Sequence, residues 1–395
     1  MFKLVNSCQN YLWGKKGSNN FVYKFAQAQE AASLDASQPY AEYWIGCHPK
    51  SFSSIIVNGE KVPLASYLKA HSLEELPYLF KVLSIDSCLS LQSHPPKGLA
   101  KLLHQKDPKN YPDENHKPEM AVTLTDFKSF CNFCPKDELI ANFKKYNCVA
   151  TVLKDKIANL EAAPEGQATK DAFKDLFLAI NTLPKSIIQE LRQEVEKFPN
   201  PTVREEVLKE VIQAYPDDLS VVATLAFNIL QLPKGKAFVM APREPHSYIS
   251  GEIVEVMALS DNVVRLGLTP KFKDYDTLVH MLTWEMGKKE LVKPETISKD
   301  GLTCTIYCPH EFEEFQCALV QGKLAEGHSG HLKTDFHSVI ANFGEPVTFS
   351  FEDGKHLELK QFETAFLLKN VSIKISSHHE VFFAVCSKNH SKIHF

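Results

Sequence analysis

The side chains of a metal site stand close together within residues 81–121. Gln92 and His94 are separated by one residue, so a regular strand would turn both side chains to the same face. The run His-Lys-Pro-Glu at 116–119 follows a polar loop, and its proline excludes a helix there. One imidazole, one carboxylate and one amide oxygen suit a hard or borderline cation such as Zn²⁺. This stretch therefore predicts part of a metal site.

A second stretch, residues 237–274, places charges on strands that otherwise have buried character. Glu255 falls in an apolar run, and Arg265 falls in the return strand after a turn at 260–262. A charge on a buried strand is costly unless it is paired or useful. Two interpretations stay open: a structural pair of Arg265 with Glu255 or Asp261, or an arginine that binds an anion or stabilises charge in a cavity.

The elements around these residues are mainly strands. Apolar residues between Val82 and Leu91 predict one strand, which a proline pair at 95–96 ends. A short helical segment follows at 99–103, and the loop at 110–117 is rich in Pro, Asp and Asn. Aromatic–glycine clusters make residues 1–60 irregular and strand-rich, with Trp44 expected to cover a core.

The spacing of apolar residues divides the remaining chain into a helical part and a strand-rich part. Apolar residues recur at helical spacing over 136–232, which predicts a helical insert of about five helices, the last reaching Leu230. Regularly spaced short strands over 301–395 predict a jelly roll or a comparable β-sandwich. Several histidines lie in expected turns of this part without carboxylates at fixed spacing, so solvated loop positions are expected for them. They are His328, His331, His337, His378 and His379.

Composition describes an ordinary globular chain. Its length of 395 residues is enough for two or three domains. The hydrophobic fraction of 44% and the charged fraction of 23% are typical of globular proteins. The formal charge of −4 argues against a nucleic-acid partner, which would favour a strongly basic surface. No apolar run approaches the length that a bilayer needs, and the N-terminus lacks the features of a signal peptide. We therefore expect a cytoplasmic protein with no membrane partner. A monomer is expected as well, although nothing in the composition determines the oligomeric state.

Ten scattered cysteines in so large a chain indicate reduced thiols in a cytosolic protein. Cys131 and Cys134 form a C-x-x-C pair, for which a redox pair or half of a zinc site are the functional alternatives. No second C-x-x-C accompanies it, and no thioredoxin-like pattern surrounds it. Two half-buried thiols at the end of a strand are the simpler expectation.

Several longer motifs occur in a fixed order along nearly the whole chain. They are Tyr11-Leu12-Trp13-Gly14, Tyr40-Ala41-Glu42-Tyr43-Trp44-Ile45-Gly46, Leu89-Ser90-Leu91-Gln92-Ser93-His94-Pro95, Asn115-His116-Lys117-Pro118-Glu119-Met120, Pro245-His246-Ser247-Tyr248-Ile249-Ser250-Gly251 and Ser260-Asp261-Asn262-Val263-Val264-Arg265. With these motifs the chain resembles the type I phosphomannose isomerases, zinc enzymes of the cupin fold that interconvert mannose 6-phosphate and fructose 6-phosphate. In that family the reaction supplies mannose 6-phosphate for GDP-mannose and glycan synthesis.

The resemblance implies a fold and a ligand set. The fold is mainly β with a helical domain: two cupin or jelly-roll β-barrels plus an all-α insert. Residues 1–135 and 233–300 would form the metal-bearing catalytic domain, 136–232 the helical insert and 301–395 the C-terminal jelly roll. One Zn²⁺ per chain would be held by Gln92, His94, Glu119 and His246, and Arg265 would be the essential arginine of the active site.

Roles for the other residues follow from the chemistry of the implied reaction, which removes a proton from C2 and returns one to C1 through an enediolate. Glu255 is the preferred base because nearby cations would keep it ionised, with His116 and Lys117 as the runners-up. The residues expected to contact the sugar phosphate are Lys81, Ser90, Tyr248, Asp261 and Lys271.

Two other functions stay open from the sequence. The first is a cupin oxygenase with redox iron, against which Gln92 as a fourth ligand argues, because that chemistry usually uses two histidines and one carboxylate. The second is a non-catalytic cupin that binds sugar phosphates, against which the intact ligand set argues.

Overall fold

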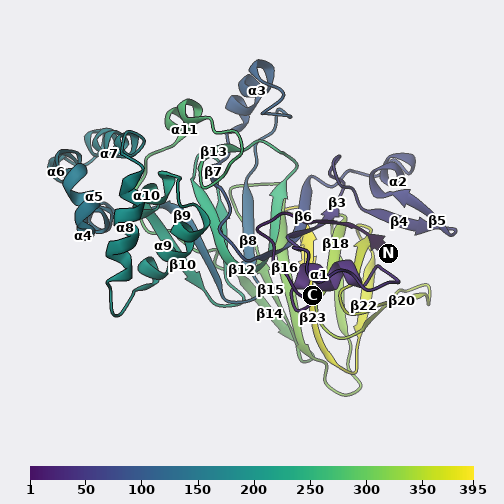
Figure 1. The fold of residues 1–395 in the computed structure, drawn as a ribbon. Coiled ribbons are helices and arrows are strands. Elements are labelled where there is room, and N and C mark those ends of the chain that lie inside the picture. The colour runs from purple at the N-terminus through teal and green to yellow at the C-terminus, as the bar shows by residue number, and fades with distance from the viewer.

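The computed structural model describes all 395 residues. The strands form three sheets, and eleven α-helices lie around them (Figure 1). The helices are α1 (Phe21–Gln27), α2 (Leu64–Ala70), α3 (Lys97–Lys106), α4 (Lys136–Lys145), α5 (Asn147–Val152), α6 (Lys154–Ala162), α7 (Gln167–Ile180), α8 (Ser186–Glu196), α9 (Val203–Ala214), α10 (Ser220–Ala223) and α11 (Tyr275–Met281), with a 3₁₀ turn η1 (Thr224–Ala226). None of them is long and apolar enough to cross a bilayer.

A ten-stranded sheet holds the predicted site residues. Its strands are β2 (Ser7–Gln9), β3 (Glu42–Gly46), β6 (Tyr78–Ile85), β7 (Leu91–Ser93), β8 (Glu119–Thr123), β9 (Phe127–Phe133), β10 (Phe227–Leu232), β11 (Ala237–Met240), β12 (His246–Ala258) and β13 (Val264–Gly267). The path runs β10-β9-β12-β6-β3-β2, with β7, β8, β11 and β13 attached beside it.

Strand β12 is the central strand of this sheet. It pairs with β9 and β7 at its start and with β6 and β8 further on. Gly251 makes the change of partners possible: its φ is +117°, and a Cβ there would lie 2.6 Å from the Asp126 carbonyl oxygen. One strand therefore carries His246 at its first residue and Glu255 nine residues later.

Two further sheets contain the C-terminal strands. The nine-stranded sheet is β14 (Glu295–Lys299), β15 (Leu302–Tyr307), β16 (Gln316–Lys323), β23 (Glu380–Ser387), β18 (Ser338–Asn342), β21 (Thr364–Leu367), β1 (Phe2–Val5), β4 (Ser54–Val57) and β5 (Glu60–Pro63), in that order. The five-stranded sheet is β20 (His356–Leu359), β19 (Val347–Ser350), β22 (Ser372–Ser376), β17 (Gly330–Thr334) and β24 (Ile393–His394). These pairing paths are open, so the two closed barrels expected from the resemblance are not confirmed.

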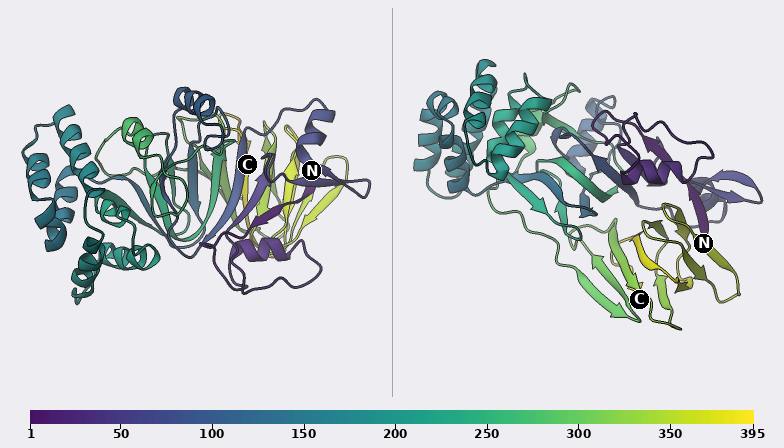
Figure 2. Two further views of the ribbon diagram at one scale, coloured as in Figure 1. Left: turned by 45° about the horizontal axis from the view of Figure 1, so that its top comes forward. Right: turned by 60° about the horizontal axis from the view of Figure 1, so that its bottom comes forward.

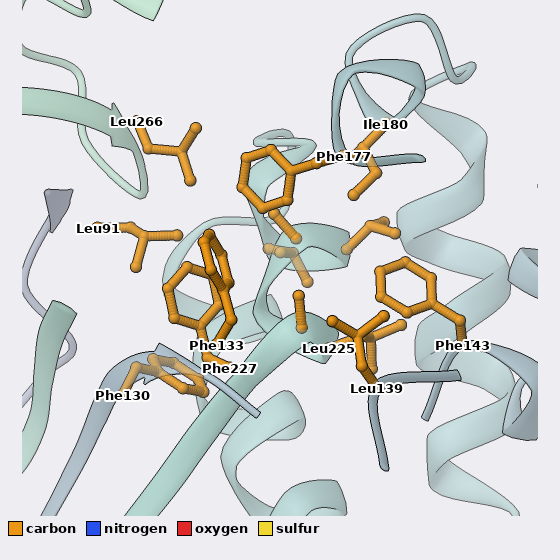
Figure 3. Close-up of a cluster of buried hydrophobic side chains, with 14 of the residues drawn as sticks. Leu91, Phe130, Phe133, Leu139, Phe143, Phe177, Ile180, Leu225, Phe227 and Leu266 are labelled. Atoms are coloured by element: carbon orange, nitrogen blue, oxygen red, sulfur yellow. The ribbon is translucent and has the colours of Figure 1, made fainter. Parts of the chain in front are cut away.

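Separate apolar cores hold the layers together. A core of 19 buried residues contains side chains from the two C-terminal sheets, and a core of 31 combines side chains of the first sheet with those of the nine-stranded sheet. The views in Figure 2 show the helices α4 to α10 gathered at one end of the strands. A core of 43 residues joins them, and Figure 3 shows Phe130, Phe133 and Phe227 of the strands packed near Phe143 and Phe177 of the helices.

The structure corrects the predicted end of the helical stretch. Helix α10 covers only four residues and η1 ends at Ala226, after which β10 pairs with β9. The spacing of Leu225, Ile229 and Leu230 fits a helix as well as a short strand, and pairing with β9 decides in favour of the strand. Seven helices rather than about five precede it, because α5 and α10 are too short to leave a clear period.

Other expectations also change. The predicted strand from Val82 to Leu91 is interrupted, because β6 ends at Ile85 and β7 begins at Leu91. His337 was expected in solvent but is fully buried, whereas His331 is exposed. Cys131 and Cys134 are free thiols at the end of β9, as expected, but both are buried.

Candidate metal and substrate site

A cavity of about 1370 Å³ opens along the face of the first sheet. Its wall includes residues of β3, β6, β7, β8, β12 and β13, together with the end of α9. Ten of the thirteen predicted site residues line it, which brings together segments far apart in the chain. They are Lys81, Ser90, Gln92, Lys117, Glu119, Tyr248, Glu255, Asp261, Arg265 and Lys271.

Two histidines and a carboxylate converge beside this cavity. The Nε2 atoms of His94 and His246 lie 3.3 and 3.2 Å from the same oxygen, Oε2 of Glu119. All three side chains are buried, with at most 2% of each residue exposed, and their ligand atoms lie within 4.8 Å of one another. Donor atoms around a tetrahedral zinc are about 3.3 Å apart, given bond lengths of about 2.0–2.1 Å. The three donors therefore have the spacing of a metal site.

The hydrogen bonds of the histidines also fit a metal. Nδ1 of His94 lies 2.8 Å from the Asn262 carbonyl oxygen, and Nδ1 of His246 lies 3.1 Å from that of Glu244. Because a carbonyl only accepts, each Nδ1 carries a hydrogen, and in the neutral form of such a ring the lone pair available to a metal is on Nε2. Neither buried Nε2 has a hydrogen-bond partner. Burial lowers the pKa of His94 to about 4, which keeps its ring neutral. The residues present thus fit Zn²⁺.

Gln92 occupies the position beside His246. The two residues face each other across β7 and β12, and Arg265 faces Gln92 from β13 on the other side. Residues directly opposite each other in antiparallel strands turn to the same face, with Cβ atoms about 4.5–5.5 Å apart. The Gln92 amide is therefore within reach of the His94–Glu119–His246 cluster. Its Oε1 accepts a hydrogen bond of 2.9 Å from the Ser90 hydroxyl.

Lys117 completes the surroundings of Glu119. Its Nζ lies 2.8 Å from Oε1 of Glu119, so each carboxylate oxygen faces a different partner. Burial alone would raise the pKa of Glu119, but Lys117 and His94 hold it well below its ordinary value. Glu119 is therefore an anion, as a metal ligand must be.

A second buried network lies further along β12. Lys81 faces Glu255 across β6 and β12, and its Nζ lies 3.0 Å from Glu255 Oε2 and 3.5 Å from Glu42 Oε2. Tyr248 donates a hydrogen bond of 2.7 Å to the other oxygen of Glu255. Burial alone would lower the pKa of Lys81, but Glu255 and Glu42 raise it above its ordinary value. Lys81 therefore stays protonated.

The surroundings of Glu255 act on its pKa in opposite directions. Nearby cations were expected to keep it ionised; burial, which is the largest effect, and the charge of Glu119 raise its pKa above its ordinary value, although Lys81 does lower it. The alternative of a structural pair with Arg265 is wrong. Glu255 pairs with Lys81, and Asp261 pairs with Lys50 at 2.8 Å and approaches His48 at 3.5 Å.

Arg265 and Lys271 form the cationic part of the cavity. Neither takes part in an ion pair with a carboxylate, unlike Lys81 and Lys117 in the same cavity. Burial lowers the pKa of Arg265, and burial together with Arg265 lowers that of Lys271. Lys271 Nζ lies 5.5 Å from the centre of the Tyr11 ring. A partly buried arginine and an exposed lysine, neither with a carboxylate partner, make this wall suited to an anion.

His116 lies away from the cavity. Its Nε2 is 2.6 Å from Glu314, in the segment between β15 and β16, and its ring meets Phe312 edge-on. The structure does not bring it together with the other predicted residues.

Sequence reasoning missed Glu42 and Trp44, which also line the cavity. Trp44 Nε1 donates a hydrogen bond of 2.6 Å to Glu42, and the Lys81 ammonium lies 4.9 Å from the Trp44 ring centre. Trp44 was expected only to cover a core. The alternation Glu-x-Trp in a strand could have shown that both side chains share one face with a polar lining.

Comparison with known proteins adds a family. Residues 1–136 match the family model described as phosphomannose isomerase type I, catalytic domain. The chain is 36% identical over 332 residues to a mannose-6-phosphate isomerase of Saccharomyces cerevisiae, covering 76% of this chain and 77% of the yeast protein. It is 34% identical over 382 residues to mannose-6-phosphate isomerase 2 of Arabidopsis thaliana, covering 85% and 86%.

Solved structures are similar over almost the whole length. A variant of phosphomannose isomerase from Salmonella typhimurium superposes with a TM-score of 0.82 at 26% identity, covering 98% of this chain and 99% of that one. A zinc-bound mannose 6-phosphate isomerase superposes with a TM-score of 0.81 at 26% identity and the same coverage.

Proposed function

Because the chain belongs to the mannose-6-phosphate isomerase family, we propose that it interconverts mannose 6-phosphate and fructose 6-phosphate. The observation that carries the proposal is the convergence of His94, Glu119 and His246 beside a cavity that also presents Arg265. A metal cluster supplies positive charge for an enediolate, and cations without counter-ions supply binding for a phosphate. The two together suit an aldose–ketose isomerisation of a sugar phosphate.

One zinc per chain would be held by His94, Glu119 and His246, with the Gln92 amide as the fourth ligand. When bound, zinc would supply a Lewis acid beside the oxygens on C1 and C2, where negative charge develops. Ser90 would orient the Gln92 amide through its hydroxyl, which donates to Oε1 at 2.9 Å. Lys117 would hold Glu119 in place through its second oxygen.

The anion-binding wall has two assigned tasks. Arg265, next to Gln92 in the sheet, would stabilise the enediolate. Lys271 lies six residues further on, past the end of β13, and would bind the phosphate. Asp261 would act indirectly by holding Lys50, which also lines the cavity.

Glu255 would move the proton between C2 and C1. A carboxylate whose pKa is raised by burial is a stronger base than one in water, and it can return the proton once it has taken it. Lys81 and Tyr248 would fix its two oxygens, and Lys81 would also offer a donor to a sugar hydroxyl. No role is assigned to His116, whose ring faces Glu314.

The same proposal covers the organisation of the chain. Residues 1–135 with 233–300 would form the catalytic unit, 136–232 a helical domain and 301–395 a C-terminal β-domain. We propose a monomer in the cytoplasm, where ten free thiols are expected to persist, and a product that feeds GDP-mannose and glycan synthesis.

The reaction is tested by an assay that couples fructose 6-phosphate formation to a reporter enzyme, with mannose 6-phosphate as the substrate. Turnover is expected. Substrate binding without turnover would leave a sugar-phosphate-binding protein, and oxygen uptake with bound iron would indicate an oxygenase; either result contradicts the proposal.

The base is tested separately by the Glu255→Gln variant. We expect its exchange of the C2 proton with deuterated water to fall by at least about 100-fold, the usual contribution of a positioned base. Its zinc content should equal that of the wild type, because Glu255 bonds to Lys81 and Tyr248 and to none of the proposed metal ligands. Exchange within a few-fold of the wild type would remove Glu255 as the base.

A further inference from the structure

A buried hydrogen-bond cluster connects two segments that carry metal ligands. Asn262 lies in the turn between β12 and β13, and Asp113 lies in the loop that leads to Lys117 and Glu119. None of the roles assigned above involves either side chain. Asn262 is fully buried, whereas Asp113 is partly exposed.

The first connection runs from Asn262 to the metal cluster. Its carbonyl oxygen accepts the Nδ1 hydrogen of His94 at 2.8 Å, which directs Nε2 of that ring toward Glu119. A partner of this kind sets the tautomer and the rotation of a metal-ligating histidine, and its loss usually weakens metal binding by about 10–100-fold.

The second connection runs from the Asn262 side chain to the loop. Its Nδ2 atom lies 2.7 Å from the Asp113 carbonyl oxygen, 2.9 Å from that of Asn115 and 3.1 Å from Oδ1 of Asp113. The Asp113 carboxylate in turn accepts hydrogen bonds from the Ser260 hydroxyl and the Asp261 backbone N–H, both at 2.8 Å. These side-chain bonds join the loop to the turn beyond the point where the pairing of β8 with β12 ends, at Glu119 and Met257.

These contacts specify the residue types. An aspartate at 262 would lose the Nδ2 donor and bring a second carboxylate against Asp113. The Oδ1 atom of Asn262 is buried without a partner, a cost that is offset only if the Nδ2 bonds matter. No chemistry at Asn262 itself is implied, because its amide is enclosed by the loop.

We propose that Asn262 and Asp113 are positioning residues, which hold the carbonyl that orients His94 at a fixed place relative to the segment that supplies Glu119. The inference rests on the proposed zinc site. It assigns to the turn after β12 a role in metal affinity, in addition to that of connecting two strands.

The test compares zinc affinity in the full chain, measured by competition with a fluorescent chelator after the metal has been removed. Asn262→Asp and Asp113→Asn are each expected to weaken zinc binding by about 10–100-fold. Asp107→Asn is the matched control, because Asp107 lies at the start of the same loop and its side chain accepts hydrogen bonds from Asn110, not from the turn between β12 and β13. The control should bind zinc like the wild type.

In the wild type the amide at position 262 donates to the carboxylate at position 113. The double variant Asn262→Asp/Asp113→Asn reverses this pair, because the amide at position 113 can donate to the carboxylate at position 262. We expect it to bind zinc more tightly than the product of the two single losses predicts, since residues in direct contact are not additive. The thermal midpoint of each metal-free variant is recorded alongside, and if Asn262→Asp does not fold, Asp113→Asn carries the test. Zinc affinity that stays unchanged while the metal-free midpoint falls would show a purely structural cluster and overturn the inference.

Failure of the proposed function is separable from failure of this inference. A wild-type chain that binds no zinc removes the zinc site and this inference with it. A wild-type chain that binds zinc, with variants that bind it equally well, removes this inference alone.

Discussion

The cationic side chains in the cavity fall into two groups, those that pair with a carboxylate and those that do not. Lys81 and Lys117 are neutralised by buried carboxylates at 3.0 and 2.8 Å, while Arg265 and Lys271 are not. Because a partly buried cation such as Arg265 is costly without a counter-ion, its presence indicates a ligand of opposite charge. The first pair therefore organises the site, and the second pair is available to an incoming anion.

Replacing Arg265 tests this distinction. We expect Arg265→Lys to lower kcat/KM by about 100-fold and Arg265→Ala to lower it further, because a lysine keeps the charge but loses the planar fork. Steady-state kinetics with mannose 6-phosphate measures the effect, and zinc content should remain that of the wild type. Near-normal kcat/KM in Arg265→Lys would reduce the role of the arginine to a point charge.

At the scale of elements, the spacing of Gln92 and His94 in the sequence predicted that the two side chains share one face. Gln92 lies in β7 and lines the cavity, and His94 follows directly after that strand and belongs to the cluster of possible metal ligands. What the sequence could not reveal is register. Lys81 and Glu255 meet across β6 and β12 although they are 174 positions apart, and nothing local in either strand encodes that pairing. Without it, Glu255 could be paired equally well with Arg265.

Sequence periodicity located the helical stretch but missed its end, because packing rather than propensity decides the state of a short apolar segment. The predicted helix reaching Leu230 becomes β10, since its backbone completes the sheet beside β9. Helix α1 was missed for a related reason. It is only seven residues long and begins at Phe21, directly after Asn20, whose side chain caps it.

A buried carboxylate ties the helices to one another and predicts a dependence on pH. Glu205 in the first turn of α9 is fully buried and bonds to Lys145, to the Tyr146 hydroxyl at 2.7 Å and to the Thr202 backbone N–H at 2.8 Å. Burial alone would raise the pKa of Glu205, but Lys145, Thr202 and Tyr146 lower it to about 2. The stabilisation is therefore complete above the ordinary carboxyl pKa of about 4.3 and is lost as the pH falls toward 2.

Glu205→Gln should accordingly lower the free energy of unfolding by about 2–3 kcal/mol at pH 7, the usual effect of removing hydrogen bonds to a charged group. Urea unfolding of the variant and the wild type at pH 7 and pH 3 measures it. The difference between the two proteins should shrink at pH 3. A difference that grows on acidification would contradict the assignment.

At the scale of the whole molecule, the first and last parts of the chain share a sheet. Strand β1 pairs with β4 on one side and with β21 on the other, and Leu4 lies in the core that both parts contribute to. Tyr78 of β6 adds hydrogen bonds to the carbonyls of His337 and Cys386. The ten-stranded sheet and the C-terminal strands are therefore expected to unfold together.

Leu4→Ala tests this coupling. Removing a leucine side chain that is 5% exposed should cost about 2–4 kcal/mol, whereas Lys3→Ala in the same strand should cost less than about 1 kcal/mol, because its pair with Glu363 is partly exposed. Hydrogen exchange should accelerate in peptides of both β3 and β21 in Leu4→Ala. Acceleration confined to one of the two would show that the parts unfold independently.

The account depends most on the metal cluster, and metal removal tests it most directly. The chain is stripped with a chelator, assayed with mannose 6-phosphate, and assayed again as zinc is added in steps. We predict loss of activity on stripping and recovery that saturates at one zinc per chain, with His94→Ala failing to recover. Full activity in a chain shown to be free of metal would contradict the account.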